Sequence, residues 1–473
     1  MLYLKQLSYN ITITDCKEKD EEGEKIVKIK NGNLTEGKPL TLILSFAFPV
    51  FLGNLFQLLY GLIDTKIVGS TIGETALASV GSVSTLYTLL TGFFNGLALG
   101  FSVVVARYFG ARNEEKLKQN VAGSILLGYG LAFLIICGVF LCLHPILVLL
   151  HVPENQMNMS YAYISILVIG MFVTLAYNLC ANMLRAIGDS VTPLIFLVLA
   201  SVVNVGLDYL FILAFHMGVA GAAWATLLSQ LLSVVLCLFH IYRKFPILHV
   251  GKAHFHSTKE EKTELLKSGL SMGLMASLVN FGTLILQSGI NALGTNIIVA
   301  HTAARKVFEL WGLPVTVLGS TMATYGGQNY GAGKYERIRE GLKVSLLMGL
   351  LWSIAILIMA QTISGYLIGF IASTDNKDIL YWGSTYLKVD MLFEMVCVVI
   401  VILRNTMQGI GDYVTPIISS FIELTAKIVF TLVFVKMFGY WGVIWTEPVT
   451  WIFMVIPLIV MILKNPVMKR NRM

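Results

Sequence analysis

The chain of 473 residues is 56% hydrophobic and only 13% charged, with a mean hydropathy of +0.76. This composition excludes an ordinary water-soluble protein and indicates a polytopic membrane protein. The net charge of +7 does not indicate a nucleic-acid partner, because the basic residues gather in the connections between apolar segments. The six cysteines are scattered, most of them inside apolar segments, which argues against a disulfide scaffold or a metal site.

Apolar stretches of about 20 residues, the length needed to cross a bilayer, recur along nearly the whole chain. They predict an all-α membrane protein with twelve transmembrane helices and little room for a soluble domain. The expected helices are residues 40–67, 76–106, 121–143, 160–183, 192–215, 219–241, 268–291, 297–327, 341–368, 382–406, 414–437 and 441–463.

Lysine and arginine residues predict the orientation of the chain. They gather in alternate connections, at residues 107–120, 243–267 and 334–343, and in the two terminal segments. The positive-inside rule places these segments in the cytoplasm, and an even number of helices agrees with both termini on that side. We therefore expect a multi-pass protein of the plasma membrane.

An internal repeat divides the sequence into two halves. Residues 187–193 recur at 410–416 with a single difference, an offset of 223 (410 − 187). Residues 108–112 resemble residues 329–333 at an offset of 221, and the pattern of Gly218, Gly221 and Trp224 recurs at the same offset. Because each half holds six helices, the repeats are expected to be parallel, forming two six-helix lobes around a central cleft.

The expected organisation has five parts. They are a polar cytoplasmic N-terminal tail (1–38), an N-terminal six-helix lobe (39–242), a cytoplasmic linker (243–267), a C-terminal six-helix lobe (268–463) and a basic cytoplasmic tail (464–473).

Four polar residues in apolar helices of the first half are candidates for a cation site: Asp64, Asn204, Asp208 and Thr226. A carboxylate inside a membrane span costs about 2.5 to 3.5 kcal/mol, so its presence indicates function by default. Asn204 and Asp208 are four residues apart and share a helix face. At about 1.5 Å per residue, Asp64, Asp208 and Thr226 lie about 7 to 10 Å from the outer helix ends, at a similar depth.

Two carboxylates, an amide oxygen and a hydroxyl group are hard oxygen ligands, which suit a sodium ion and can equally hold a shared proton. Neutralising the pair by either ion is expected to change the preferred helix packing, and hence to support alternating access. No cofactor and no other metal is expected. A structural role stays open for single residues, since Asp64 could pair with Lys66 and Asn204 could join two helices.

Charged residues also lie in helices of the second half. Glu423 and Lys427 are four residues apart in the order that favours an ion pair, so a structural pair is the better interpretation. Asp390 and Glu394 are also four apart but of like sign. Glu394 is a candidate for cargo or proton binding, and no other substrate-binding residue is assigned.

Several motifs together resemble those of the multidrug and toxic compound extrusion (MATE) family, bacterial type. They are residues 59–65 with Val68 and Gly69, the Gly110-Ala111 loop, the turn at residues 184–189 and the Asn204 and Asp208 pair. The resemblance covers roughly residues 38–463. It implies a secondary antiporter that exports amphipathic or cationic drugs and toxic compounds in exchange for protons or sodium ions.

The resemblance also bears on the cation site. Asp64, Asn204, Asp208 and Thr226 match the cation site in the N-terminal lobe of one branch of the family. Another branch uses acidic residues of helices 7 and 10 in the C-terminal lobe, but residues 269–291 contain no acid. The sequence therefore resembles the branch with the N-lobe site.

Other functions remain alternatives at this point. A flippase for lipid-linked or polysaccharide precursors, of the same superfamily, would line its cleft with several cations, and few are present in the helices. A membrane-embedded enzyme would need a catalytic cluster in the bilayer, but the histidines lie mostly in loops or near helix ends. A channel is disfavoured by the parallel repeat. We expect no enzymatic activity, and a monomer whose partners are small molecules and membrane lipids.

Overall fold

The computed structural model describes residues 32–150 and 152–469, and these residues form helices joined by short connections. The six long helices of the first lobe are α2 (Pro39–Thr71), α3 (Glu74–Gly110), α4 (Glu114–Leu141), α6 (Glu154–Ala186), α7 (Val191–Tyr209) and α8 (Gly218–Lys244). Those of the second lobe are α9 (Lys259–Asn291), α10 (Thr295–Gly331), α11 (Tyr335–Ala372), α12 (Lys377–Gly409), α13 (Val414–Val429) and α16 (Thr446–Lys464). The expected all-α fold with twelve helices in two lobes is confirmed.

Short helices complete the two lobes. They are α5 (Leu143–Leu149), α14 (Val435–Phe438), α15 (Tyr440–Ile444), the π-helices η1 (Leu210–Ala214) and η4 (Phe430–Phe434), and the 3-10 helices η2 (Pro246–Leu248), η3 (Lys252–Phe255) and η5 (Pro466–Met468). Both π-helices directly follow the fifth long helix of their lobe, so the internal repeat extends to this irregularity.

The repeated motif at residues 187–193 and 410–416 is a helix-to-helix turn. Gly188 and Gly411 adopt φ values of +91° and +95°, which end the preceding helix because glycine carries no Cβ. Asp189 then accepts hydrogen bonds from the backbone N–H groups of residues 191 and 192, and Asp412 does the same at the start of α13. A proline in the first turn of each following helix needs no such partner. The sequence repeat therefore encodes the turn that joins helices five and four of each lobe.

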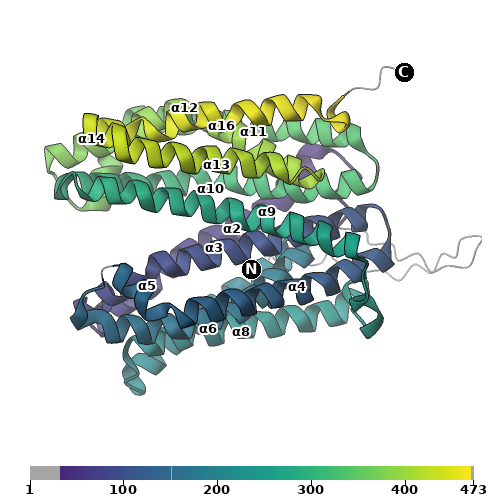
Figure 1. The fold of residues 1–473 in the computed structure, drawn as a ribbon, viewed down its shortest axis with the longest axis horizontal. Coiled ribbons are helices and arrows are strands. Elements are labelled where there is room, and N and C mark those ends of the chain that lie inside the picture. The colour runs from purple at the N-terminus through teal and green to yellow at the C-terminus, as the bar shows by residue number, and fades with distance from the viewer. Residues whose placement is uncertain (1–31, 151, 470–473) are drawn as a thin grey trace, which may run out of the picture.

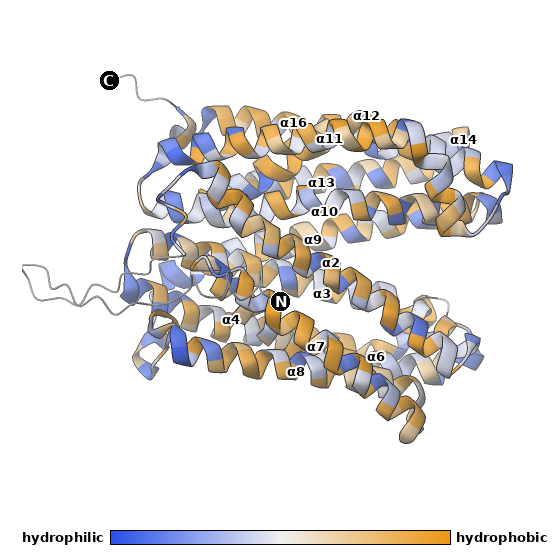
Figure 2. Cartoon of the chain, turned by 180° about the vertical axis from the view of Figure 1, so that it is seen from behind, coloured by the Kyte–Doolittle hydropathy of each residue, from blue (hydrophilic) through white to orange (hydrophobic). Residues whose placement is uncertain are grey.

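In the described part of the chain, ten helices are long and apolar enough by themselves to cross a membrane. The two other long helices, α10 and α12, carry more charge, and α12 buries Asp390, Glu394 and Arg404 inside the second lobe. Polar residues gather at the two ends of the bundle and hydrophobic ones along its length (Figure 2), as expected for a protein surrounded by lipid. Large side chains such as Phe370, 73% exposed, lie on that lipid-facing surface.

Each lobe has a hydrophobic interior of its own. Phe94 and Phe101 lie in the core of the first lobe, and Tyr386 and Leu387 in that of the second. Helices α2 and α9 connect the lobes: α2 packs on α7 and also on α10 and α11, whereas α9 packs on α3 and also on α13. Because α2 and α9 are equivalent helices of the two repeats, each packs in the same way on its own lobe and on the opposite lobe.

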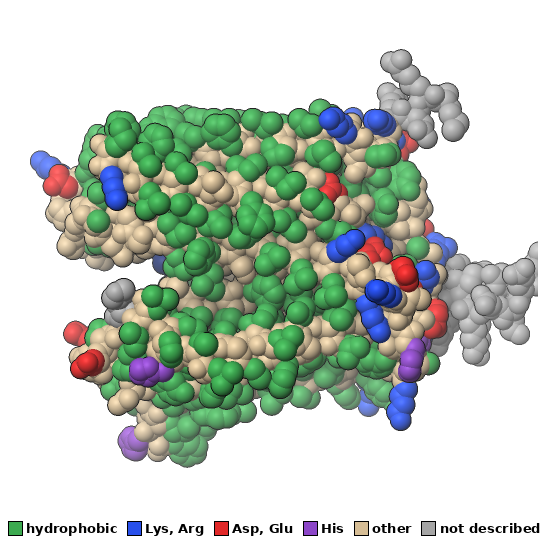
Figure 3. Space-filling model, viewed as in Figure 1, with side chains coloured by type: hydrophobic (Ala, Val, Ile, Leu, Met, Phe, Trp, Pro, Cys, Tyr) green, Lys and Arg blue, Asp and Glu red, His purple; other side chains and the backbone are tan. Residues whose placement is uncertain are grey.

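The lobes contact each other at one end and separate toward the other (Figure 1). We call the end with the connections at residues 111–113, 187–190, 332–334 and 410–413 the closed end, and the end with α5 and α14 the open end. Figure 3 shows the cleft between the lobes at the open end. The expected central cleft is therefore present, with access from one side.

Candidate cation site and the closed end of the cleft

Asp64 of α2 and Asp208 of α7 lie together inside the first lobe. Their carboxyl groups lie near each other. Asp208 is fully buried, and neither of its oxygens, nor Oδ1 of Asp64, receives a hydrogen bond in the described part of the chain. Ionised carboxylates only accept hydrogen bonds, so a bond between the two requires a proton on one of them. The pair therefore suits either a shared proton or a cation between the carboxylates.

The two other candidate residues lie on the same helices or next to them. Asn204 precedes Asp208 by one turn of α7, is fully buried, and has no hydrogen-bond partner for its amide oxygen or nitrogen among the described residues. Thr226 of α8 is buried, and its hydroxyl oxygen lies 3.3 Å from the hydroxyl oxygen of Tyr60 on α2. Unpaired buried amides are costly, so Asn204 stays a candidate ligand of the expected cation site.

Lys66, the residue that could have paired with Asp64, is exposed and forms no ion pair with it among the described residues. The carboxyl group of Asp64 therefore has Asp208, and not Lys66, as its charged neighbour. Pairing with Lys66 is therefore not the structural role of Asp64, whereas a contact with a neighbouring helix was the other structural interpretation of this residue.

Three tyrosines that the sequence analysis missed surround the carboxyl pair. Tyr60 of α2, Tyr87 of α3 and Tyr163 of α6 all lie within electrostatic range of Asp64. Tyr87 lies near Gln230 of α8, whose Oε1 accepts a 2.8 Å hydrogen bond from Thr174 of α6. Tyr60 could have been found, because it stands one turn before Asp64 and shares its helix face. Tyr87 and Tyr163 could not have been found in this way, because neither helix carries a member of the carboxyl pair.

The helix that carries Asp208 changes geometry immediately after it. Residues Val191–Tyr209 are α-helical, and the chain then continues as the π-helix Leu210–Ala214. Single π-turns inside membrane helices are rare and occur frequently at functional sites, since the extra residue re-aims side chains and frees backbone groups. The irregularity therefore agrees with a functional role for the end of α7.

The second lobe contains a buried ion network. Nζ of Lys427 lies 3.0 Å from Oε1 of Glu423, which confirms the expected pair, and 3.2 Å from Oε1 of Glu447. Arg404 adds a 3.4 Å ion pair to Oε2 of Glu423. All four side chains are at most 8% exposed. The network is larger than the sequence indicated, because Arg404 and Glu447 come from other helices.

Asp390 and Glu394 lie beside this network on α12. They are 0% and 2% exposed, and both oxygens of Asp390 and Oε2 of Glu394 have no hydrogen-bond partner among the described residues. Glu394 therefore remains a candidate for proton or cargo binding. The structure gives it no direct contact with Asp64 or Asp208, which belong to the other lobe.

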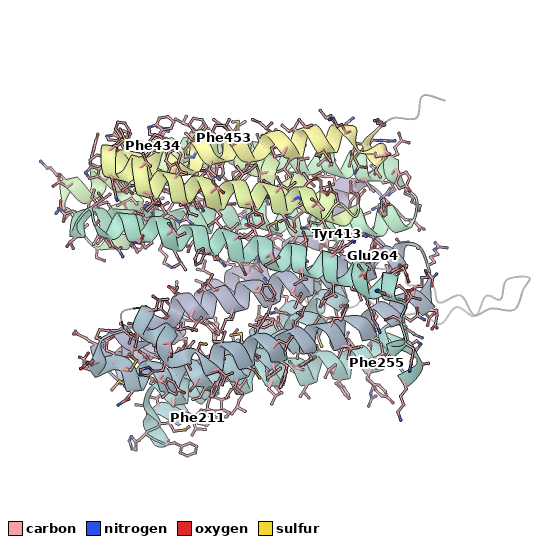
Figure 4. The ribbon with its side chains drawn as sticks, in the orientation of Figure 1. Phe211, Phe255, Glu264, Tyr413, Phe434 and Phe453 are labelled. Carbon is pink, nitrogen blue, oxygen red and sulfur yellow. The ribbon has the colours of Figure 1, made fainter. Side chains whose placement is uncertain are left out.

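The closed end is held by Arg107 of α3. Its Nε donates to the carbonyl oxygen of Gly409 at 2.9 Å, and Nη2 donates to that of Gln408 at 2.7 Å. Its Nη1 contacts Glu264 at 2.8 Å and the Tyr413 hydroxyl at 2.7 Å. Figure 4 places Glu264 and Tyr413 side by side where the lobes meet. A guanidinium thus binds the carbonyl end of α12, the negative end of its dipole.

Gln328 of α10 is the counterpart of Arg107, at the offset of 221 (328 − 107). Its Nε2 donates to the carbonyl oxygen of Ala186 at 2.8 Å, at the end of α6 in the first lobe. The helices α3 and α10 also touch backbone to backbone, since a Cβ at Gly110 would fall on the Gln328 carbonyl oxygen and one at Gly331 on that of Arg107. Two equivalent contacts therefore close the same end.

The segment of residues 32–37 adds a third contact at the closed end. The backbone N–H of Leu34 donates to Oε1 of Gln328 at 2.9 Å, and the Leu34 carbonyl accepts from Asn329. Arg337 donates to the carbonyl oxygen of Gly37 at 2.9 Å, whereas Gly32 packs on the backbone of residues 187 and 188. The segment therefore touches both lobes.

A multi-pass membrane protein with two pseudo-symmetric lobes, a cleft open at one end and an unpaired carboxyl pair inside one lobe has the architecture of a membrane transporter. The family model described as MatE matches residues 49–210 and, a second time, residues 272–433. The chain belongs to the MatE family, which is a family of transporters and not of enzymes. The two matches are offset by 223 (272 − 49), as in the repeated turn.

Similar proteins agree with this assignment. The chain is 27% identical over 420 residues to the probable multidrug resistance protein YpnP of Bacillus subtilis, covering 88% of this chain and 93% of that protein. It is 21% identical over 404 residues to the multidrug export protein MepA of Staphylococcus saprophyticus, covering 85% and 89%. A solved structure described as the outward-facing conformation of a multidrug resistance MATE family transporter shares the fold, with a TM-score of 0.85, 21% identity and coverage of 93% and 99%.

Proposed function

We propose that this protein exports amphipathic or cationic small molecules across the plasma membrane in exchange for a proton or a sodium ion that binds at Asp64 and Asp208. The observation that carries this proposal is that the two carboxyl groups lie near each other, while Asp208 and Oδ1 of Asp64 receive no hydrogen bond from the described residues. The names of the relatives, a multidrug resistance protein and a multidrug export protein, favour this class of cargo. Asn204 and Thr226 complete the oxygen ligands.

The mechanism starts from repulsion between like charges in a poorly solvated interior. When both carboxyl groups are ionised and no cation is bound, α2 and α7 are driven apart at Asp64 and Asp208. A proton or a sodium ion removes the repulsion and lets the helices approach. Because α2 also packs on α10 and α11 of the second lobe, its movement changes the contact between the lobes. Ion binding and cleft geometry are thereby coupled.

We further propose that the closed end faces the cytoplasm and the open end faces the outside. The basic connections Arg112, Lys116 and Lys118 lie at the closed end, as the positive-inside rule requires of cytoplasmic segments. Both termini are then cytoplasmic. The proposed division is a tail at 1–38, lobes at 39–242 and 268–463, a linker at 243–267 and a basic tail at 464–473. The protein acts as a monomer in lipid, without a cofactor.

Dye transport in inverted membrane vesicles tests this function, because export from the cell appears there as uptake into the vesicle. The uptake of a fluorescent cationic dye is measured under an imposed proton gradient or an imposed sodium gradient, for the native chain and for Asp208→Asn. One of the two gradients is expected to drive dye movement, and the substitution is expected to abolish the coupling, since it leaves a single ionisable group in the pair. Asp378→Asn, on the exposed start of α12, is the matched control and is expected to transport normally.

Dye movement that neither gradient changes would contradict the antiporter, and it would reopen the flippase alternative. Unchanged coupling in Asp208→Asn would remove that residue from the site.

A further inference from the structure

The buried network at Lys427 lies at the place in the second lobe that corresponds to the cation site of the first. The family model aligns the lobes at an offset of 223, so Asn204 corresponds to Lys427 (204 + 223) and Asp208 to Thr431. The glycine and tryptophan pattern at the start of α8 recurs at an offset of 221, so Thr226 corresponds to Glu447 (226 + 221).

Local structure supports this correspondence. In both lobes the helix that carries the site passes into a π-helix, Leu210–Ala214 in the first and Phe430–Phe434 in the second. Figure 4 shows Phe211 and Phe434, one from each of these π-helices, near the open end of their lobes. The third helix is also equivalent: Tyr60 of α2 corresponds to Thr283 of α9 (60 + 223). Tyr60 contacts Thr226, and Thr283 contacts Lys427.

The candidate cation site of the first lobe and the Lys427 network of the second lobe carry different charged side chains at corresponding positions. In the first lobe, two carboxyl groups meet with no basic side chain between them. In the second lobe the equivalents of Asp64 and Asp208 are the neutral residues Gln287 and Thr431. A basic side chain, Lys427, replaces the unpaired amide of Asn204.

Oxygen atoms surround the ammonium group of Lys427. Its Nζ lies 3.0 Å from Oε1 of Glu423, 3.2 Å from Oε1 of Glu447 and 3.3 Å from Oγ1 of Thr283, and Lys427 itself is 1% exposed. These are the hard oxygen ligands, two carboxylates and a hydroxyl group, that alkali-metal cations prefer in proteins. The ammonium group thus sits where a bound monovalent cation would find its ligands.

We propose that the second lobe contains a monovalent cation site that is permanently filled by the ammonium group of Lys427, and that it binds sodium or potassium once that group is removed. Arg404 neutralises one of the two carboxylates, so the loss of Lys427 leaves one uncompensated negative charge, which a single alkali-metal ion restores to balance. The tethered ammonium neutralises this network whatever ion is present. The exchange of alkali-metal ions is thereby confined to the first lobe.

The test is a melting experiment on the purified full-length protein in detergent, in sodium, potassium or choline chloride. All variants carry Asp208→Asn, which silences the site of the first lobe, so the result does not depend on whether the proposed transport function is correct. Adding Lys427→Gln is expected to create a rise in melting temperature of about a few degrees in sodium or potassium relative to choline. The Asp208→Asn variant alone is expected to show no such difference.

A third variant identifies the ligands. Adding Glu447→Gln to the pair of substitutions removes the uncompensated charge and one ligand, and it is expected to abolish the response to alkali-metal ions. Equal melting temperatures of the Lys427→Gln variant in all three salts would overturn the proposal. So would a response that persists after Glu447→Gln.

The loss of one partner from a buried ion pair is strongly destabilising, so the Lys427→Gln variant is also prepared in each salt from the start. Folding in sodium, potassium or methylammonium chloride but not in choline chloride, judged by a single symmetric peak in size-exclusion chromatography, supports the site. A protein that fails to fold in all four salts overturns it, because the proposal requires a small free cation to replace the tethered one.

Discussion

At the scale of single residues, the proposed cation site is distinguished by buried polar groups that have no hydrogen-bond partner among the described residues. Asp208 and Asn204 are buried without partners, whereas the buried Lys427, Glu423 and Glu447 satisfy one another. A buried polar group without a partner is costly, and a fold retains it where a ligand supplies the missing contact. Asn204 of α7 and Lys427 of α13 occupy corresponding positions in the two lobes. The polar groups around Asn204 have no partner among the described residues, whereas those around Lys427 are paired with its ammonium group.

This contrast gives a prediction for Asn204→Lys, which would place an ammonium group next to Asp208. We expect the variant to fold, to lose any dependence of its melting temperature on sodium or pH that the native protein shows, and to lose gradient-driven dye transport. The physical reason is that a tethered cation neutralises the carboxylate permanently, as Lys427 does in the second lobe.

Thermal melting with and without sodium, at two pH values, measures this effect. Asn204→Gln, which keeps the amide, is the control and retains the response to the ion. A Lys variant whose melting temperature still rises with sodium would contradict the prediction.

At the scale of helices, α3 and α10 decide whether the cleft is closed at the end with Arg107 and Gln328. Each supplies one polar side chain to a helix end of the opposite lobe, and their glycines allow the two backbones to touch. Burial raises the pKa of the Tyr413 phenol, which lies just before α13, so its hydroxyl group stays protonated and can donate to Glu264. Arg107 therefore forms an ion pair with the carboxylate of Glu264 and donates hydrogen bonds to the backbone carbonyl oxygens of Gln408 and Gly409.

Arg107→Ala is expected to shift the protein toward opening of the closed end. Hydrogen bonds to a charged group contribute about 1.5 to 3 kcal/mol each, so the loss of several changes the ratio of closed to open forms by about tenfold or more. Spin labels at the exposed positions 112 and 336, on opposite lobes, report this change as a longer distance in pulsed electron paramagnetic resonance.

Lys118→Ala is the matched control, since Lys118 pairs only within α4, with Glu114. Its distance distribution should equal that of the labelled native chain. An unchanged distribution in Arg107→Ala would show that packing of α3 on α10 alone holds the lobes.

At the scale of the whole molecule, two features join the lobes in addition to the contacts of Arg107 and Gln328. The helices α2 and α9 each pack on both lobes, and residues 32–37 touch Gln328 on one lobe and the turn at residues 187–188 on the other. A rotation of the lobes about their contact therefore must break the contacts of residues 32–37, whereas α2 and α9 can bend. This segment stabilises the closed form.

Leu34→Asp tests the contribution of this segment, because Leu34 is only 4% exposed and packs against the second lobe. We expect the substitution to leave the twelve helices folded and to increase the open fraction at the closed end, seen with the same spin labels. Glu36→Gln, at an exposed neighbouring position, is the control. If Leu34→Asp and the native chain give the same distance distribution, the segment does not hold the lobes together.

The sequence by itself determined the membrane class, the twelve helices and the two-lobed repeat, because hydrophobic length and a repeated turn are local features of the chain. It also singled out Asp64 and Asp208, since a carboxylate in an apolar span stands out against its neighbours. The tyrosines around them, the partners of Lys427 and the contacts of Arg107 were decided only by the tertiary structure. Each of those contacts joins residues from different helices, and the relative rotation and depth of two helices depend on packing that neither helix encodes alone.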